Sequence, residues 1–84
     1  MHAAWRIAPD AELRFRFWNE ECVLYHGAAG NTHLVPEPVG RLLQALAGAA
    51  NSVHGLSELV DLHVDDVTKS MQEMRRLGIA EFAA

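Results

Sequence analysis

Several side chains in this chain could bind a metal or take part in acid–base chemistry, namely Cys22, His2, His26, His33, His54 and His63. A structural zinc site needs four Cys or His ligands at a recognisable spacing. Neither a CxxC nor an HxxxH pair occurs here. Cys22 and His26 could form a nucleophile and base, but no third group orients them, and a thiol in an apolar strand is usually unreactive. The sequence therefore predicts a protein without metal, cofactor or catalytic site.

Two further patterns resemble sites that bind phosphate or nucleic acid. The segment GAAGN at residues 27–31 lacks the lysine and the following helix of a phosphate-binding loop. Arg14 and Arg16 flank aromatic residues, as in sheets that bind nucleic acid, although two arginines also mark the solvated face of an ordinary strand. The chain has 7 basic and 11 acidic residues and a net charge of −4, which disfavours binding to phosphates.

The totals indicate one small intracellular domain. The chain has 84 residues, of which 50% are hydrophobic and 21% charged, so it can form a core and is too apolar to be disordered. A single cysteine excludes an intramolecular disulfide, which fits a reducing compartment. No apolar run is long enough for a membrane span, and no signal peptide is recognisable. We expect a soluble cytoplasmic protein.

The first half of the chain has the pattern of strands. Residues 13–17 alternate apolar and basic side chains, which predicts a half-buried strand with Leu13, Phe15 and Phe17 on one face. Residues 22–25 and 32–35 are expected as second and third strands. The turns between them are short, so the simplest topology is an antiparallel meander. Residues 5–7 could form a further short strand or an arm.

Apolar residues at helical spacing predict three helices in the second half. The first is expected to start at Pro38, and the second to follow Gly55. Asp65 is a good N-cap for the third, and Gly78 suits the left-handed turn that ends it. The third helix has an apolar stripe of Val67, Met71, Met74 and Leu77. Ile79 and Phe82 are expected to fold back onto the core.

The last strand of the meander should lie at an edge of the sheet. An edge strand carries unpaired N–H and C=O groups that an extended peptide can pair with. If the third helix lies beside residues 32–35, strand and helix form a groove. Met71 and Met74 could line that groove, because methionine adapts to varied ligands. At this spacing, at least one of them is more simply explained as core.

The order of these elements resembles the PqqD family, small domains also called RiPP recognition elements. The resemblance rests on FRFWNEECVLYHG for two strands, THLVPEPVGRLLQAL for the third strand and first helix, and GLSELVDLHVDDVTKSMQEMRRLGIAEF for the remaining helices. It extends over roughly residues 13–82, so residues 1–84 form a single PqqD-like domain. It implies an α+β fold that is winged helix-turn-helix-like, with a three-stranded antiparallel sheet followed by three helices.

The resemblance also implies a function. Members of the family are non-catalytic chaperones that bind the leader of a ribosomally made precursor peptide and present it to a modifying enzyme. In pyrroloquinoline quinone (PQQ) biosynthesis that enzyme is a radical SAM protein. The chain is also similar to a branch of the family associated with an HPr-kinase-like protein. The leader is added as a strand, which implies the peptide-binding residues Thr32, His33, Leu34, Val35, Val67, Ser70, Met71, Met74 and Arg75.

One departure and two alternatives accompany this reading. Pro36 stands where the family usually has a polar residue that caps the first helix, so the cap must come from Glu37 or water. Pro36 also removes an N–H from the edge.

A winged-helix DNA-binding regulator is the alternative function, although Asp65 and Asp66 would point carboxylates at the DNA. A homodimer formed through the edge strand is compatible with peptide binding.

Overall fold

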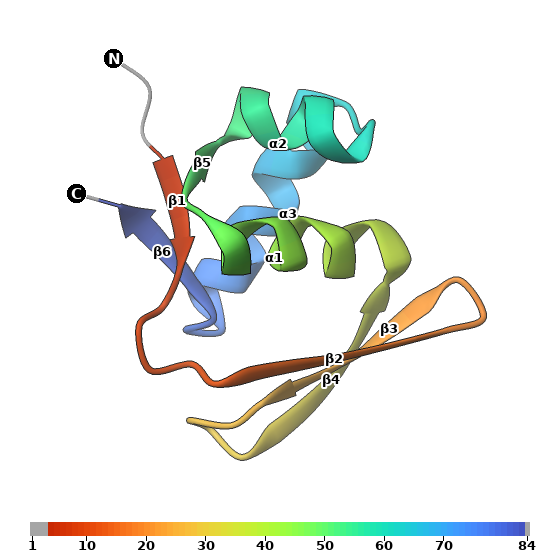
Figure 1. Cartoon of the computed structure of the whole chain (residues 1–84), viewed down its shortest axis with the longest axis vertical. Coiled ribbons are helices and arrows are strands. Elements are labelled where there is room, and N and C mark those ends of the chain that lie inside the picture. The colour runs from red at the N-terminus through yellow and green to blue at the C-terminus, as the bar shows by residue number, and fades with distance from the viewer. Residues whose placement is uncertain (1–3, 84) are drawn as a thin grey trace.

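The predicted meander is present in the computed structural model, which describes residues 4–83 of an α+β fold (Figure 1). Strands β2 (Leu13–Trp18), β3 (Glu21–His26) and β4 (Asn31–Pro36) form an antiparallel sheet in the order β2-β3-β4. Asn19 and Glu20 both have positive φ between β2 and β3, as in the type I′ turns that match the twist of a hairpin. The first half of the chain therefore folds as its alternation predicts.

A second three-stranded sheet was not expected. Strand β1 (Ala4–Ile7) lies between β5 (Asn51–Ser52) and β6 (Ala80–Ala83), antiparallel to both. The prediction of one sheet followed by three helices is therefore incomplete. The N-terminal segment is a central strand, and its Arg6 Nε donates to Glu81 Oε2 at 2.8 Å.

The three predicted helices are present, with different starting points. Helix α1 (Glu37–Gly48) begins one residue before Pro38, and the Glu37 N–H donates to the carbonyl of Glu20 at 3.0 Å. No side chain caps this end of α1. The carbonyl of Glu20, in the β2–β3 turn, instead satisfies the first N–H of the helix. The Glu37 carboxylate instead accepts from Arg41 Nε at 2.9 Å.

Helix α2 (Val53–Val60) includes Gly55 instead of following it. The hydroxyl of Ser52 accepts the Gly55 N–H at 3.0 Å, so Ser52 is the N-cap. Helix α3 (Val64–Arg76) is capped by His63, and the prediction of Asp65 as its cap is wrong. The His63 Nδ1 accepts the Asp65 N–H at 3.1 Å, which places Asp65 inside the first turn.

The end of α3 follows the prediction. Gly78 has a φ of 78° and its N–H donates to the Arg75 carbonyl. The next N–H, of Ile79, donates to the Met74 carbonyl at 2.9 Å. These two bonds form a Schellman motif, which reverses the chain and turns Ile79 into the core.

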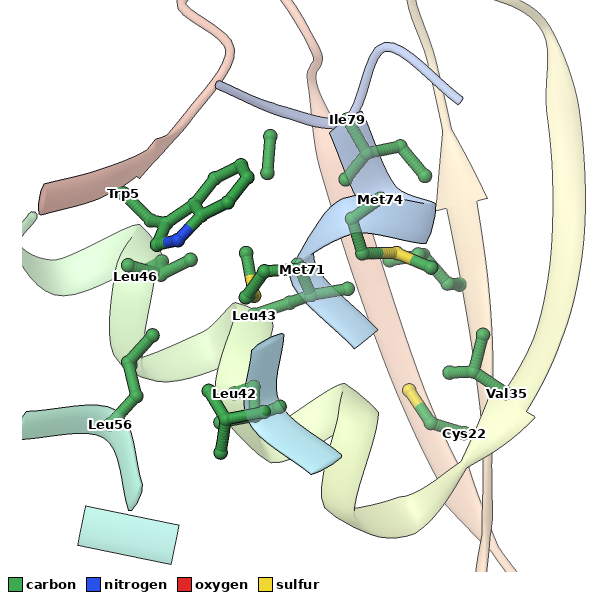
Figure 2. Close-up of a cluster of buried hydrophobic side chains, with 13 residues drawn as sticks. Trp5, Cys22, Val35, Leu42, Leu43, Leu46, Leu56, Met71, Met74 and Ile79 are labelled. Carbon is green, nitrogen blue, oxygen red and sulfur yellow. The ribbon is translucent and has the colours of Figure 1, made fainter. Parts of the chain in front are cut away.

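The core lies between the helices and the inner face of the β2–β3–β4 sheet (Figure 2). Helix α1 packs against β3, and α3 contributes its apolar stripe. Trp5 of β1 packs at one end of this core, and its ring centroid lies 4.3 Å from that of Phe82. Phe82 itself is partly exposed, so of the expected closing pair only Ile79 is fully buried. Within the described residues, no helix is long and apolar enough to cross a membrane.

Candidate functional site

Strand β4 is an edge of its sheet, as expected. It pairs with β3 from Glu21↔Pro36 to His26↔Asn31. In a two-residue type I′ hairpin, the residues that flank the turn, here Trp18 and Glu21, form a hydrogen-bonded pair. Along antiparallel strands, such pairs alternate with pairs that are not hydrogen-bonded. It follows that residues 31, 33 and 35 direct their backbone groups to β3, whereas Thr32 and Leu34 direct theirs to the outer edge.

That outer edge is available for pairing within the described part of the chain. Among residues 4–83, no backbone hydrogen bond is made to the outward N–H and C=O groups of Thr32 and Leu34. Thr32 is exposed, and the Leu34 side chain is 64% exposed. Pro36 has no N–H, so the edge offers two amide donors, at Thr32 and Leu34.

The apolar side chains predicted for the groove lie in the core. Val67 and Met71 are completely buried, and Met74 and Val35 nearly so. All four belong to one buried cluster (Figure 2). A peptide on the β4 edge would adjoin Val35, whereas it could reach Val67, Met71 and Met74 only after repacking of the core.

The polar residues predicted on α3 are closer to solvent. Ser70 is half-buried and Arg75 is exposed. The guanidinium of Arg75 lies 4.5 Å from the centroid of the Phe82 ring, a cation–π contact that holds it over β6. Of the strand residues, His33 is half-buried. The accessible residues of the predicted site are therefore Thr32, His33 and Leu34 on β4, and Ser70 and Arg75 on α3. Helix α3 packs mainly against α2, β6 and α1 and not beside β4, so the structure does not bring the two groups together as a groove.

The candidate Cys–His pair lies on the inner face of β3. Cys22 and His26 are both buried, and the Nδ1 of His26 has no hydrogen-bond partner among residues 4–83. Burial raises the pKa of the Cys22 thiol, although a backbone hydrogen bond from Arg16 lowers it by a smaller amount. A nucleophilic cysteine needs a stabilised thiolate, which this environment disfavours.

The remaining histidines are dispersed. His33 is on β4, His54 on α2, and His63 at the start of α3, whereas His2 lies outside the described residues. In the part of the chain from 4 to 83, no three His, Cys, Asp or Glu side chains are grouped to hold a metal ion.

The exposed ends of α3 bear on DNA binding. Asp65 and Asp66 are both exposed in its first turn. Arg76 forms an ion pair with Glu73 on the same helix, and this pairing lowers the pKa of Glu73. Lys69 is thus the cation on α3 that neither pairs with a carboxylate nor stacks on a ring in the described chain.

A second surface lies on the outside of the β2–β3–β4 sheet. The sequence allowed it to be a solvated strand face or a face that binds nucleic acid. The register aligns outward side chains in rows, and the middle row is Arg16, Val23 and Leu34. These three, with Trp18 and Glu21, line a hollow of about 370 Å³. The alternation of Arg14, Arg16 and Trp18 was the available signal, but it gave no sign that β3 and β4 add apolar residues to the same face.

Comparisons with protein-family models, with curated proteins and with solved structures give no match to this chain. Function must therefore be argued from the chain's own surfaces. Two surfaces that could contact a partner are the backbone edge at Thr32 and Leu34 and the outer face of the sheet.

Proposed function

We propose that this protein is a non-catalytic, PqqD-like peptide chaperone of the cytoplasm. It binds the leader of a ribosomally made precursor peptide as an added strand on β4 and presents it to a modifying enzyme. The outer edge of β4, with no partner in residues 4–83, is the main support for this proposal. Strand addition uses just such an edge, with main-chain hydrogen bonds for affinity and alternate side chains for specificity.

The geometry of β4 limits how a peptide binds. Thr32 and Leu34 each offer one N–H and one C=O, so the edge supports up to about four backbone hydrogen bonds. Each such bond adds roughly 0.5–1.5 kcal/mol, so four together supply about 2–6 kcal/mol. A micromolar complex needs about 8.2 kcal/mol, and side-chain contacts of the peptide must supply the remainder. Alternate peptide residues then lie beside Leu34 on the outer face. The others lie on the inner side of the sheet, beside His33 and Val35 of β4.

The helices support a winged helix-turn-helix-like description of the second half of the chain. Helices α2 and α3 are joined by only residues 61–63, within the length of a helix-turn-helix connection. Strand β6, which follows α3, pairs with the N-terminal β1. We do not extend this description to DNA binding, because Asp65 and Asp66 stand at the end of α3 that would enter the major groove.

Calorimetric titration with the peptide encoded beside the gene tests the proposal. Leu34→Lys removes an apolar neighbour of the added strand and should weaken binding about fivefold, the size of a cross-strand side-chain pair. Leu59→Lys is the matched control, because Leu59 is 67% exposed on α2, away from the edge, and this variant should bind as the parent does.

Thr32→Pro removes one of the two outward amide donors and should weaken binding about tenfold, the equivalent of one hydrogen bond. Amide spectra of each variant should first establish that the sheet is retained. Equal affinity in Leu34→Lys, Leu59→Lys and Thr32→Pro would exclude the β4 edge as the binding site.

A further inference from the structure

The outer face of the β2–β3–β4 sheet is apolar at its centre and basic at one side. Val23 and Leu34 occupy the middle of the face, and Trp18, 67% exposed, stands at its end. Tyr25 adds a partly exposed ring in the row beyond Val23. An exposed grouping of this kind on a small protein usually marks a contact surface.

The charge of this face differs from that of the whole chain. Most of the 7 basic residues are engaged: Arg6, Arg41 and Arg76 in ion pairs, and Arg75 over Phe82. Among residues 4–83, neither Arg14 nor Arg16 is ion-paired with a carboxylate, and both lie on this face. Glu21 is the one acidic side chain in the outward rows of the described sheet. The surface is locally basic on a chain with a net charge of −4.

The size of the face limits what can cover it. Three strands of six residues measure about 20 by 14 Å, from a rise of about 3.4 Å per residue and a strand spacing of about 4.8 Å. The resulting footprint, about 280 Å², is far below the roughly 800 Å² that each partner buries in a standard interface. Any partner docked through this face alone would therefore bind weakly and reversibly, and a stable dimer of this chain would need a larger contact.

A single helix fits these dimensions. An α-helix is about 10 Å across, and 12 residues extend about 18 Å. The inner face of the same sheet already accommodates such a helix, the 12-residue α1 (Figure 1). A helix on the outer face would bury Val23 and Leu34 under its apolar stripe and place its flanking side chains over Arg14 and Arg16.

We propose that the outer face of the β2–β3–β4 sheet docks an amphipathic helix of another protein, with acidic side chains along the flank that lies over β2. Electrostatic complementarity of this kind directs and orients association more than it adds affinity. Leu34 belongs both to this face and to the β4 edge, so the docked helix would adjoin a peptide bound at that edge. This last point rests on the proposed function, whereas the docking itself does not.

The test uses the full chain labelled with ¹⁵N and a synthetic helical peptide of about 15 residues, long enough to form a helix. The peptide carries leucines at helical spacing and glutamates on one flank. One matched peptide has lysines in place of the glutamates, and another has the same composition in scrambled order. We expect saturable shifts of the Trp18 indole N–H and the Val23 and Leu34 amides with the glutamate peptide alone.

Charge reversal on the protein supplies the matched variants. Arg16→Glu should weaken binding about fivefold, the upper range for an exposed ion pair. Lys69→Glu makes the same change in charge on α3, at a cation that has no ion pair among residues 4–83, and it should leave the affinity unchanged. Arg16→Glu should leave the affinity for the leader peptide unchanged. Thr32→Pro should leave the affinity for the glutamate peptide unchanged. The two variants therefore distinguish a failure of helix docking from a failure of leader binding.

Four results would overturn the proposal. They are an absence of shifts, equal shifts with the lysine or scrambled peptide, concentration-dependent shifts of these residues in the protein alone, and preferential binding of a single-stranded oligothymidine. The third result would assign the face to a second copy of the chain. The fourth would assign it to nucleic acid, which also uses aromatic and arginine side chains on exposed sheets.

Discussion

Gly40 of α1 lies directly against Cys22 of β3. A Cβ atom at residue 40 would be 2.6 Å from the Cys22 Cβ and 2.7 Å from its Sγ. Helix α1 follows β4 without an intervening loop. The close approach of Gly40 to β3 therefore fixes where β4 leaves the sheet, and with it the edge at Thr32 and Leu34.

Gly40→Ala should destabilise the protein by about 1–3 kcal/mol, the range for overpacking a closely packed core. The added methyl group would also approach Phe17 Cε1, at 2.9 Å, so neither strand offers room. Gly48→Ala on the same helix is the control, because among the described residues, apart from its chain neighbours and the nearby backbone of its own helix, nothing lies within 4 Å of its added Cβ. Urea denaturation should show a lower midpoint for Gly40→Ala and little change for Gly48→Ala. Equal midpoints would contradict the packing described.

The two tryptophans should differ sharply in their effect on stability. Trp5 is 3% exposed in the core, and Trp18 is 67% exposed on the sheet. Trp5→Ala should cost about 3–5 kcal/mol, as for large aromatic residues in other cores. Trp18→Ala should change the free energy of unfolding by no more than about 0.5 kcal/mol. Thermal unfolding followed by circular dichroism distinguishes them, and a stable Trp5→Ala variant would contradict the central position of β1.

The buried thiol of Cys22 predicts a loss of stability in alkali. Its pKa is raised in the folded state, so the folded protein disfavours the thiolate relative to the unfolded chain. The stability is fully present below the ordinary thiol pKa of about 8.5 and falls as the pH rises above it. Urea midpoints at pH 7 and about pH 9.5 should differ by less in Cys22→Ala than in the parent. Alkylation of Cys22 should also be slow until the protein unfolds. Rapid alkylation of the native protein would show that the thiol is accessible.

The sequence predicted what local patterns determine. Alternation from Leu13 to Phe17 identified β2, and the polar and glycine-containing turns identified the meander. The edge position of β4 followed from its place at the end of that meander. Gly78 was recognised because the left-handed turn after a helix favours glycine, whatever the tertiary contacts.

Features that depend on distant contacts were missed or misplaced. Strands β1, β5 and β6 are short, and Arg6 pairs with Glu81 across almost the whole chain, so no local pattern indicates the second sheet. The second helix was expected to follow Gly55, but Ser52 caps α2 through the Gly55 N–H, so the helix begins at Val53. Helical spacing alone could not decide whether Met71 and Met74 line a groove or fill the core, where the structure places them.

The central claim is that a peptide binds along β4, and an amide NMR titration of the ¹⁵N-labelled protein tests it most directly. The ligand is the small peptide encoded beside the gene, and a short duplex DNA is the control. We predict shifts at Thr32 to Val35, with no response to the duplex. Shifts confined to the duplex and centred on Asp65 and Asp66, or peptide shifts that avoid β4, would contradict the account.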